Sequence, residues 1–167
     1  MDWPWRFSRR YAWLLVGILW SLPHTVQADP FLGRLDCVSL QVNVLESGES
    51  FGVTSQLLRD AARSELKKLA PTLSLEPSCP DQVSLKVFIQ SVTSGTAQQF
   101  FGHALLEVRR KAIFRDTALL ASTRAWDLES YLYGPRAQAK TVVLKHLNRL
   151  LAQFAEDYGA ANKREAR

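Results

Sequence analysis

The stretch at residues 136–158, RAQAKTVVLKHLNRLLAQFAEDY, decides the fold of this chain. Its apolar residues recur at steps of three and four, which places them on one stripe of an α-helix. The stripe consists of Ala139, Val143, Leu147, Leu150, Phe154 and Tyr158, widened by Leu144 and Leu151. Gly134 and Pro135 interrupt the chain before this helix, and Gly159 can take a left-handed conformation after it. Such a helix needs an apolar surface to cover.

The segments upstream supply that surface. Apolar and polar residues alternate over 38–44, 83–90, 100–114 and 119–128, which is the pattern of half-buried strands. Inward-facing residues are predicted as Val83, Leu85, Val87 and Ile89 in the second strand and as Leu120, Trp126 and Leu128 in the last. Arg110 interrupts an apolar face, so we expect it to lie near an edge or to be paired.

A second helix is predicted between the first two strands. Thr54 can cap it, and Pro71 stops it after Leu69. Its buried stripe is predicted as Leu58, Ala62, Leu66 and Leu69. The element pattern predicts an α+β fold, a two-layer sandwich in the order β-α-β-β-β-α. Its sheet is expected to be four-stranded and mostly antiparallel, with two helices packed on one face.

Residues 1–28 have the pattern of a cleavable secretory signal peptide. Arginines at the start precede the apolar run YAWLLVGILW at residues 11–20, and VQA at 26–28 predicts cleavage between Ala28 and Asp29. The run spans only half of the ~20 residues a bilayer needs, although an uncleaved leader that anchors the chain in a membrane is the alternative. Arg9 and Arg10 also resemble the start of a twin-arginine signal, so general secretion and twin-arginine export both stay open. Residues 29–161 are predicted to form one domain, followed by a frayed charged tail at 162–167.

Removing the leader lowers the charge of the chain. The whole chain has 21 basic and 16 acidic residues; the leader holds three Arg and one Asp, which leaves 18 and 15, a net charge of +3. This weak basicity gives no reason to predict nucleic-acid binding. The expected location is the bacterial periplasm.

The mature part contains both cysteines, Cys37 and Cys79. A pair of cysteines in an oxidising compartment most often forms a disulfide. Neither has further metal ligands or a base at suitable spacing, so we predict a structural disulfide.

No motif of a catalytic, metal or cofactor site is present, and we predict a protein without enzymatic activity or cofactor. The mature histidines, His103 and His146, are not in a metal-binding spacing. Asp127 and Glu129 lie near aromatic residues, as in a small glycan hydrolase. The interpretation we favour is that both acids are solvated, that Trp126 is in the core, and that Tyr131 and Tyr133 pack the loop into the long helix.

Two groups of residues are candidates for binding. Lys86, Phe88, Arg109 and Lys111 are predicted to lie on the outer sheet face, where the cations form a patch for an anionic lipid or glycan of the envelope. Phe100 and Phe101 adjoin in one strand, so one ring must leave the core and can contact a partner at a hairpin rim.

The order of strand, Thr-capped helix ending in Leu-Ala-Pro, strand, long hairpin, Trp-bearing strand and C-terminal helix resembles small exported bacterial α+β domains, among them the N-terminal domain of TolB. This resemblance implies an accessory, protein-binding role in envelope assembly or transport. We therefore expect an envelope protein as the partner, an anionic envelope lipid or glycan as the alternative ligand, and membrane contact only through an uncleaved leader.

Overall fold

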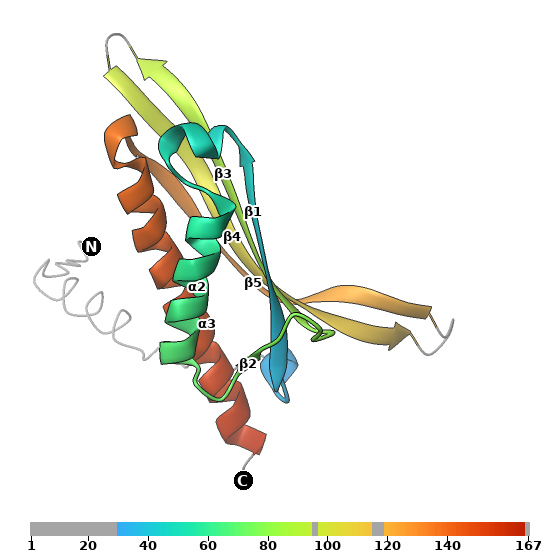
Figure 1. Ribbon diagram of the computed structural model, residues 1–167. Coiled ribbons are helices and arrows are strands. Elements are labelled where there is room, and N and C mark those ends of the chain that lie inside the picture. The colour runs from blue at the N-terminus through green and yellow to red at the C-terminus, as the bar shows by residue number, and fades with distance from the viewer. Residues whose placement is uncertain (1–29, 95–96, 115–118, 166–167) are drawn as a thin grey trace, which may run out of the picture.

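The computed structural model describes residues 30–94, 97–114 and 119–165, in which a five-stranded sheet is covered on one face by two α-helices (Figure 1). The elements are η1 (Pro30–Leu32), β1 (Cys37–Glu46), η2 (Ser47–Phe51), α2 (Ser55–Leu69), β2 (Ser74–Leu75), β3 (Gln82–Ser94), β4 (Ala97–Phe114), β5 (Leu119–Pro135), η3 (Arg136–Gln138) and α3 (Ala139–Glu165). None of the described helices is long and apolar enough to cross a membrane. The predicted leader and its cleavage site at Ala28 lie outside the described residues.

The strand order is β2-β1-β3-β4-β5. The three long strands β3, β4 and β5 form the predicted antiparallel meander, whereas β1 is parallel to both of its neighbours. The prediction of four mostly antiparallel strands is roughly right, but the sheet has a short fifth strand, β2, and it is partly parallel at β1. The reason is that α2 carries the chain back along β1, so the strands that follow α2 start from the same end as β1.

The core lies between the sheet and the two helices (Figure 1). The predicted inward residues of β3 are all at most 1% exposed, and the predicted stripe of α3 is buried from Ala139 to Tyr158. Thr54 caps α2 as predicted, because its hydroxyl accepts a hydrogen bond of 3.1 Å from the backbone N–H of Leu57. Leu69 was expected in the buried stripe of α2 but is 39% exposed, since it lies in the last turn of the helix.

The helix α3 was predicted to end at Gly159, but it continues to Glu165. Ala161 is 5% exposed, and Asn162 donates to the carbonyl of Leu32 at 3.4 Å and accepts from the N–H of Arg34 at 3.3 Å. These contacts with the start of the described chain hold the last turns in place. The tail expected to fray from Asn162 onward is therefore helical as far as Glu165.

The β4–β5 hairpin extends beyond the helices (Figure 1). A register shift lies between Val108 and Arg109, and past it the two strands project away from the rest of the molecule (Figure 1). Leu120 in this projection is 58% exposed, so its prediction as a core residue is wrong. At its other end β5 continues past the predicted limit at Leu128, and Leu132 joins the core.

Candidate functional site

The candidate site is the sheet face opposite the helices, which we call the open face because no described element covers it (Figure 1). Its side chains alternate along each strand with those of the core. Successive cross-strand rows are Gln90, Phe101 and Tyr133; Leu45, Phe88, His103 and Tyr131; Asn43, Lys86, Leu105 and Glu129; Gln41, Ser84, Glu107 and Asp127; and Ser39, Gln82, Arg109 and Arg124.

One half of the open face is aromatic. Six residues in two adjoining rows form what we call the aromatic patch: Leu45, Phe88, Phe101, His103, Tyr131 and Tyr133. Tyr131 and Tyr133 are 66% and 77% exposed, and Phe101 is 48% exposed. Phe88 and His103 stack across β3 and β4, with ring centroids 5.4 Å apart. Large apolar side chains are thus gathered on one accessible surface.

The structure separates the two adjacent phenylalanines as predicted. Phe100 is 1% exposed and packs against Phe51 in the core, with ring centroids 6.2 Å apart, whereas Phe101 joins the aromatic patch. The interpretation that Tyr131 and Tyr133 pack into the long helix is wrong. Because β5 continues to Pro135, strand alternation turns both rings to the open face.

A buried carboxylate organises the other half of the open face. Glu107 is fully buried, and its Oε1 accepts hydrogen bonds from Lys86 Nζ at 2.8 Å and from Arg109 Nε at 2.9 Å. Arg124 Nε lies 3.5 Å from Oε2. The predicted cationic patch is therefore partly neutralised from within, since two of its three cations, Lys86 and Arg109, are engaged with Glu107. Alternation predicted that Glu107 points outward, but only the fold shows that neighbouring cations cover it.

The surroundings of Glu107 keep it ionised. Burial by itself raises the pKa of a carboxyl group, but the hydrogen bond and charge of Lys86, followed by those of Arg109, outweigh the burial. The net result is a pKa below the ordinary value of 4.5. With Asp127 and Glu129 on the same face, three carboxylates stand among the three cations Lys86, Arg109 and Arg124, so the charged cluster that borders the aromatic patch is close to balanced.

The two candidate acids lie on the open face and are exposed. Asp127 Oδ2 lies 3.6 Å from Arg124 Nη1, and Glu129 stands beside Leu105 of the next strand. Trp126, which directly precedes Asp127, is 8% exposed, and its indole N–H donates to Asp157 of α3 at 3.0 Å. The interpretation of Trp126 as a core residue and of both acids as solvated is confirmed.

His146 of α3 contacts Ser130 of β5. Its Nδ1 lies 2.6 Å from the hydroxyl oxygen of Ser130. Burial, followed by the charges of Lys145 and Arg149, lowers the pKa of His146 below 6.5. The arrangement favours the neutral ring, and it is a contact between helix and sheet that the sequence spacing did not reveal.

This histidine predicts a pH dependence of stability. Its pKa is lower in the folded chain, so below 6.5 the unfolded state takes up protons first, and stability falls as the pH decreases toward the folded pKa. We expect His146→Gln to lose that part of the decline between about pH 7 and pH 5. Urea unfolding of both proteins across this range checks it. An unchanged pH dependence in the variant would contradict the assignment.

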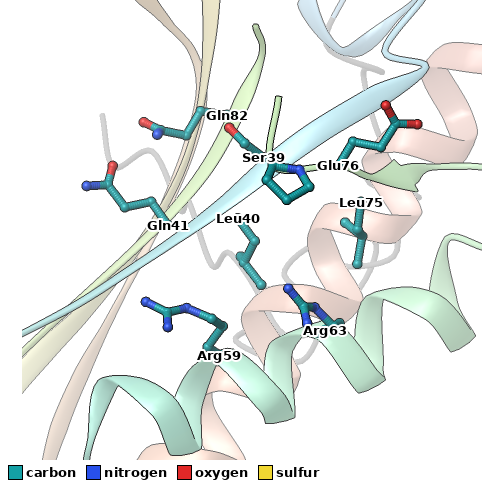
Figure 2. Close-up of a pocket in the computed structure, with 9 residues that line it drawn as sticks. Ser39, Leu40, Gln41, Arg59, Arg63, Leu75, Glu76 and Gln82 are labelled. Atoms are coloured by element: carbon teal, nitrogen blue, oxygen red, sulfur yellow. The ribbon is translucent and has the colours of Figure 1, made fainter. Parts of the chain in front are cut away.

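A cleft that the sequence did not indicate lies at the outer edge of β1, and Figure 2 shows its lining. Its volume is about 360 Å³. The cleft is lined by Ser39, Leu40 and Gln41 of β1, Arg59 and Arg63 of α2, Leu75, Glu76 and Pro77 after the helix, and Gln82 of β3. In Figure 2 the two arginines extend from α2 toward β1. The signal available in the sequence was the spacing of these arginines, one helical turn apart.

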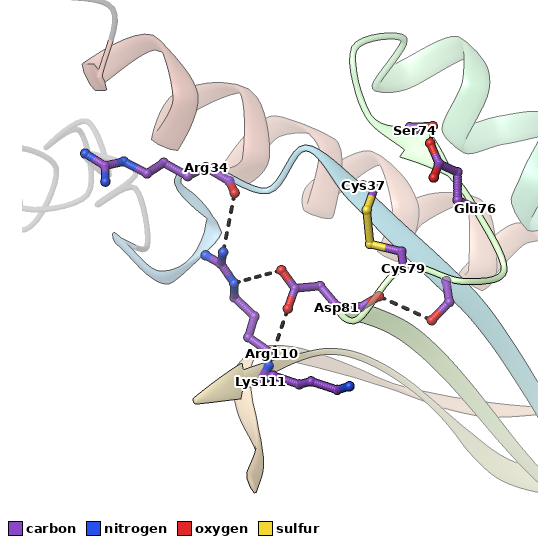
Figure 3. Close-up of a disulfide and its surroundings, with 9 residues drawn as sticks. Arg34, Cys37, Ser74, Glu76, Cys79, Asp81, Arg110 and Lys111 are labelled. Atoms are coloured by element: carbon purple, nitrogen blue, oxygen red, sulfur yellow. Dashed lines mark hydrogen bonds and ion pairs between the residues drawn. A yellow bond between two sulfur atoms is a disulfide. The ribbon is translucent and has the colours of Figure 1, made fainter. Parts of the chain in front are cut away.

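The predicted disulfide between Cys37 and Cys79 is confirmed (Figure 3). Beside it, Asp81 accepts a hydrogen bond from Arg110 Nε at 3.1 Å. Arg110 also donates to the carbonyls of Phe31 and Gly33, at 3.0 and 2.8 Å. The expectation that Arg110 is paired is confirmed, and together these bonds join the start of the described chain, the turn before β3 and the strand β4.

Comparison with known proteins gives the fold and no family. No protein-family model and no curated protein matches the chain. Among solved structures, the hypothetical protein CT253 from Chlamydia trachomatis matches with a TM-score of 0.50 at 8% identity, over 74% of this chain and 98% of that chain. The PelC dodecamer from Paraburkholderia phytofirmans matches with a TM-score of 0.44 at 13% identity, over 78% and 92% of the two chains.

A minor lipoprotein from Acinetobacter baumannii matches with a TM-score of 0.40 at 11% identity, over 77% of this chain and 93% of the other. These neighbours are small bacterial proteins. The likeness to CT253 shows a shared fold and does not extend to function. The resemblance to the N-terminal domain of TolB stays a prediction.

Proposed function

We propose that this protein is a non-catalytic binding module of the bacterial cell envelope, and that its open face docks onto a partner protein. The observation that carries the proposal is the aromatic patch. Tyr131, Tyr133 and Phe101 are about half to three quarters exposed and lie next to one another on the open face. Exposed tyrosine and phenylalanine side chains gathered in this way are typical of the centre of a protein interface.

The charged half of the open face supports a protein partner over an anionic lipid or glycan. Lys86 and Arg109 already donate to Glu107, so a phosphate or sugar acid would have to compete with a buried carboxylate. A balanced charge cluster beside an aromatic surface corresponds to the polar rim of an interface. Export is supported by the disulfide, which is rare in reducing compartments, and by the leader pattern.

The proposal is tested by placing a photo-crosslinking amino acid at Tyr131 or Tyr133 in the protein made in bacteria. We expect both positions to crosslink to the same envelope protein. A probe at Lys145, exposed on α3, serves as the control and is expected to give no such product. Mass spectrometry of the crosslinked band identifies the partner.

The purified partner then allows a quantitative check. We expect Tyr131→Glu to weaken its affinity at least tenfold, because a charge is placed in the apolar centre of the interface. Glu129→Gln, at the edge of the patch, is the matched control and should change the affinity little. Equal affinity of the Tyr131→Glu variant, or crosslinks from Lys145 alone, would refute docking through this face. Crosslinks only to a second copy of the chain would show that the open face mediates self-association and does not bind a different envelope protein.

A further inference from the structure

Most of β1 has no paired strand on one of its two sides in the described part of the chain. On this side β1 pairs only with the two residues of β2, Cys37 with Ser74 and Val38 with Leu75. Among the described residues, the last backbone hydrogen bond along this edge runs from the N–H of Glu76 to the carbonyl of Val38 and is 3.0 Å long. Pro77 follows, and because proline has no N–H it cannot continue the ladder. Beyond this point no strand pairs with this side of β1 in the described part of the chain.

The backbone groups of Leu40 and Val42 point to this edge. In a strand these groups alternate in direction, and the carbonyls of Asp36 and Val38 accept from the β2 side, at 3.0 Å each. Leu40 and Val42 lie two and four residues after Val38, so their backbone N–H and C=O groups point in the same direction as those of Val38. At the far end, the N–H of Val44 donates to Ser55 Oγ at 3.3 Å, so the side chain of α2's first residue closes the edge there. The unpaired stretch between Val38 and Val44 is a template for one short added strand.

The cleft of about 360 Å³ lies beside this edge at Ser39, Leu40 and Gln41 and is bordered by Leu75, Glu76 and Pro77, where β2 ends. Its lining comes from both sides of β1: Ser39 and Gln41 belong to the open face, whereas Leu40 points to the helix side and toward Arg59 and Arg63 (Figure 2). A groove that follows a strand edge in this way accommodates an extended chain. A rounded small molecule would leave the edge hydrogen bonds unmade.

The charge of the cleft indicates the kind of chain. Arg59 donates to Gln56 Oε1 at 3.2 Å, and neither Arg59 nor Arg63 has a carboxylate within ion-pair distance among the described residues. The acid of the cleft, Glu76, accepts from the hydroxyl of Ser74 at 2.7 Å. Two guanidinium groups therefore face the cleft with no anion assigned to them.

The spacing of the arginines matches a strand. Four helical residues rise about 6 Å, and side chains two apart in a strand are separated by about 6.6 Å. The helix α2 runs alongside β1 (Figure 1). Carboxylates on alternate residues of an added strand would therefore meet the two arginines in turn.

We propose that the β1 edge binds an extended acidic segment of a partner protein. The segment adds to the sheet beside Leu40 and Val42, and two of its carboxylates, on residues two apart, pair with Arg59 and Arg63. This site is separate from the aromatic patch, and the inference does not depend on the function proposed for the open face.

The test measures the fluorescence anisotropy of a labelled ETETE peptide titrated with the mature protein. In an added strand its glutamates face α2 and its threonines face Ser39 and Gln41. We expect saturable binding by ETETE and at least tenfold weaker binding by QTQTQ, which keeps the shape and removes the charge. A backbone N-methylated ETETE should also bind at least tenfold more weakly, because it cannot form the ladder.

Substitutions on α2 locate the site. Arg59→Glu and Arg63→Glu should each weaken ETETE binding at least tenfold, and Arg63→Met checks the loss of charge without reversal. Lys67→Glu, exposed on the same helix, is the matched control and should leave the affinity unchanged. Circular dichroism confirms that each variant is folded.

Three outcomes would overturn the inference: no ETETE binding up to about 1 mM, equal binding of QTQTQ, or equal affinity of the arginine variants. Arginine-dependent binding to phosphatidylglycerol vesicles in the absence of peptide binding would assign the arginines to a lipid and refute the strand. Tyr131→Glu should not affect ETETE binding, so this site and the open face succeed or fail separately.

Discussion

Replacing Cys37 and Cys79 together by serine is expected to lower the free energy of unfolding by about 4 kcal/mol. The two residues are separated by 42 positions, and closing a loop of that length removes conformational entropy from the unfolded chain. A loss of this size is a large part of the stability of a small domain, which is about 5–15 kcal/mol. Urea unfolding of the oxidised protein and of the double variant measures the difference.

The structure adds a local consequence of losing the disulfide. Cys37 begins β1, and Cys79 lies in the turn between β2 and β3, next to Asp81 and its bonds to Arg110 (Figure 3). Without the crosslink, the two residues of β2 are held to β1 mainly by backbone hydrogen bonds. We expect the double substitution to accelerate solvent exchange of the amides of Ser74 and Glu76 relative to the native protein, and to accelerate exchange of the β3 amides less.

Reduction of the native protein is the control for this prediction. Dithiothreitol should lower the midpoint of native unfolding toward that of the double variant and leave the variant itself unchanged. A variant as stable as the oxidised protein would show that the unfolded chain is already compact enough for the crosslink to contribute little.

The second large effect is expected at Glu107. Its replacement by alanine should lower the free energy of unfolding by about 2–3 kcal/mol. Breaking a buried ion pair typically costs about 3–5 kcal/mol, but Lys86 and Arg109 are 36% and 38% exposed and can recover part of their hydration. The variant also leaves the cations Lys86, Arg109 and Arg124 close together without the carboxylate whose negative charge offsets their mutual repulsion.

The pH dependence identifies this mechanism. The pKa of Glu107 in the folded protein lies below 4.5, so its contribution to stability is fully present above that value. The contribution is lost as the pH falls below 4.5 through the folded pKa. The difference between native protein and Glu107→Ala should therefore shrink in acid, as measured by urea unfolding at several pH values.

Two further variants separate charge from packing at this position. Glu129→Ala removes an exposed acid from the same face, and a change within about 0.5 kcal/mol is expected. Glu107→Gln keeps the side-chain volume and one acceptor for Lys86, so it should be less destabilising than alanine. A Glu107→Ala variant with native stability at neutral pH would contradict a structural role for the cluster.

Much of this fold is determined locally, and those parts were predicted from the sequence. The stripe of α3 from Ala139 to Tyr158, the Thr54 cap and the alternation in β3 depend on residues a few positions apart. The disulfide was predicted from the number of cysteines and the expected compartment, and the separation of Phe100 from Phe101 follows from strand geometry alone.

The ends of helices and strands were predicted less well, because a residue such as glycine ends an element only where tertiary contacts do not stabilise its continuation. Gly159 was expected to end α3, but Ala161 and Asn162 pack against the start of the described chain and extend the helix. Alternation placed Leu120 in the core, yet the hairpin leaves the helices beyond the register shift at Val108.

The candidate sites depend on strands that are distant in the sequence. Only the register of β3, β4 and β5 brings Lys86, Arg109 and Arg124 around Glu107 and places Tyr131 beside His103. Only the parallel position of β1 and the early end of β2 at Leu75 leave an edge open next to Arg59 and Arg63. The sequence by itself determined the two α-helices, the four long strands and the crosslink, because these follow from local periodicity and composition. The tertiary structure decided which charges are neutralised and which surfaces stay free, because both depend on strand pairing between residues far apart in the chain.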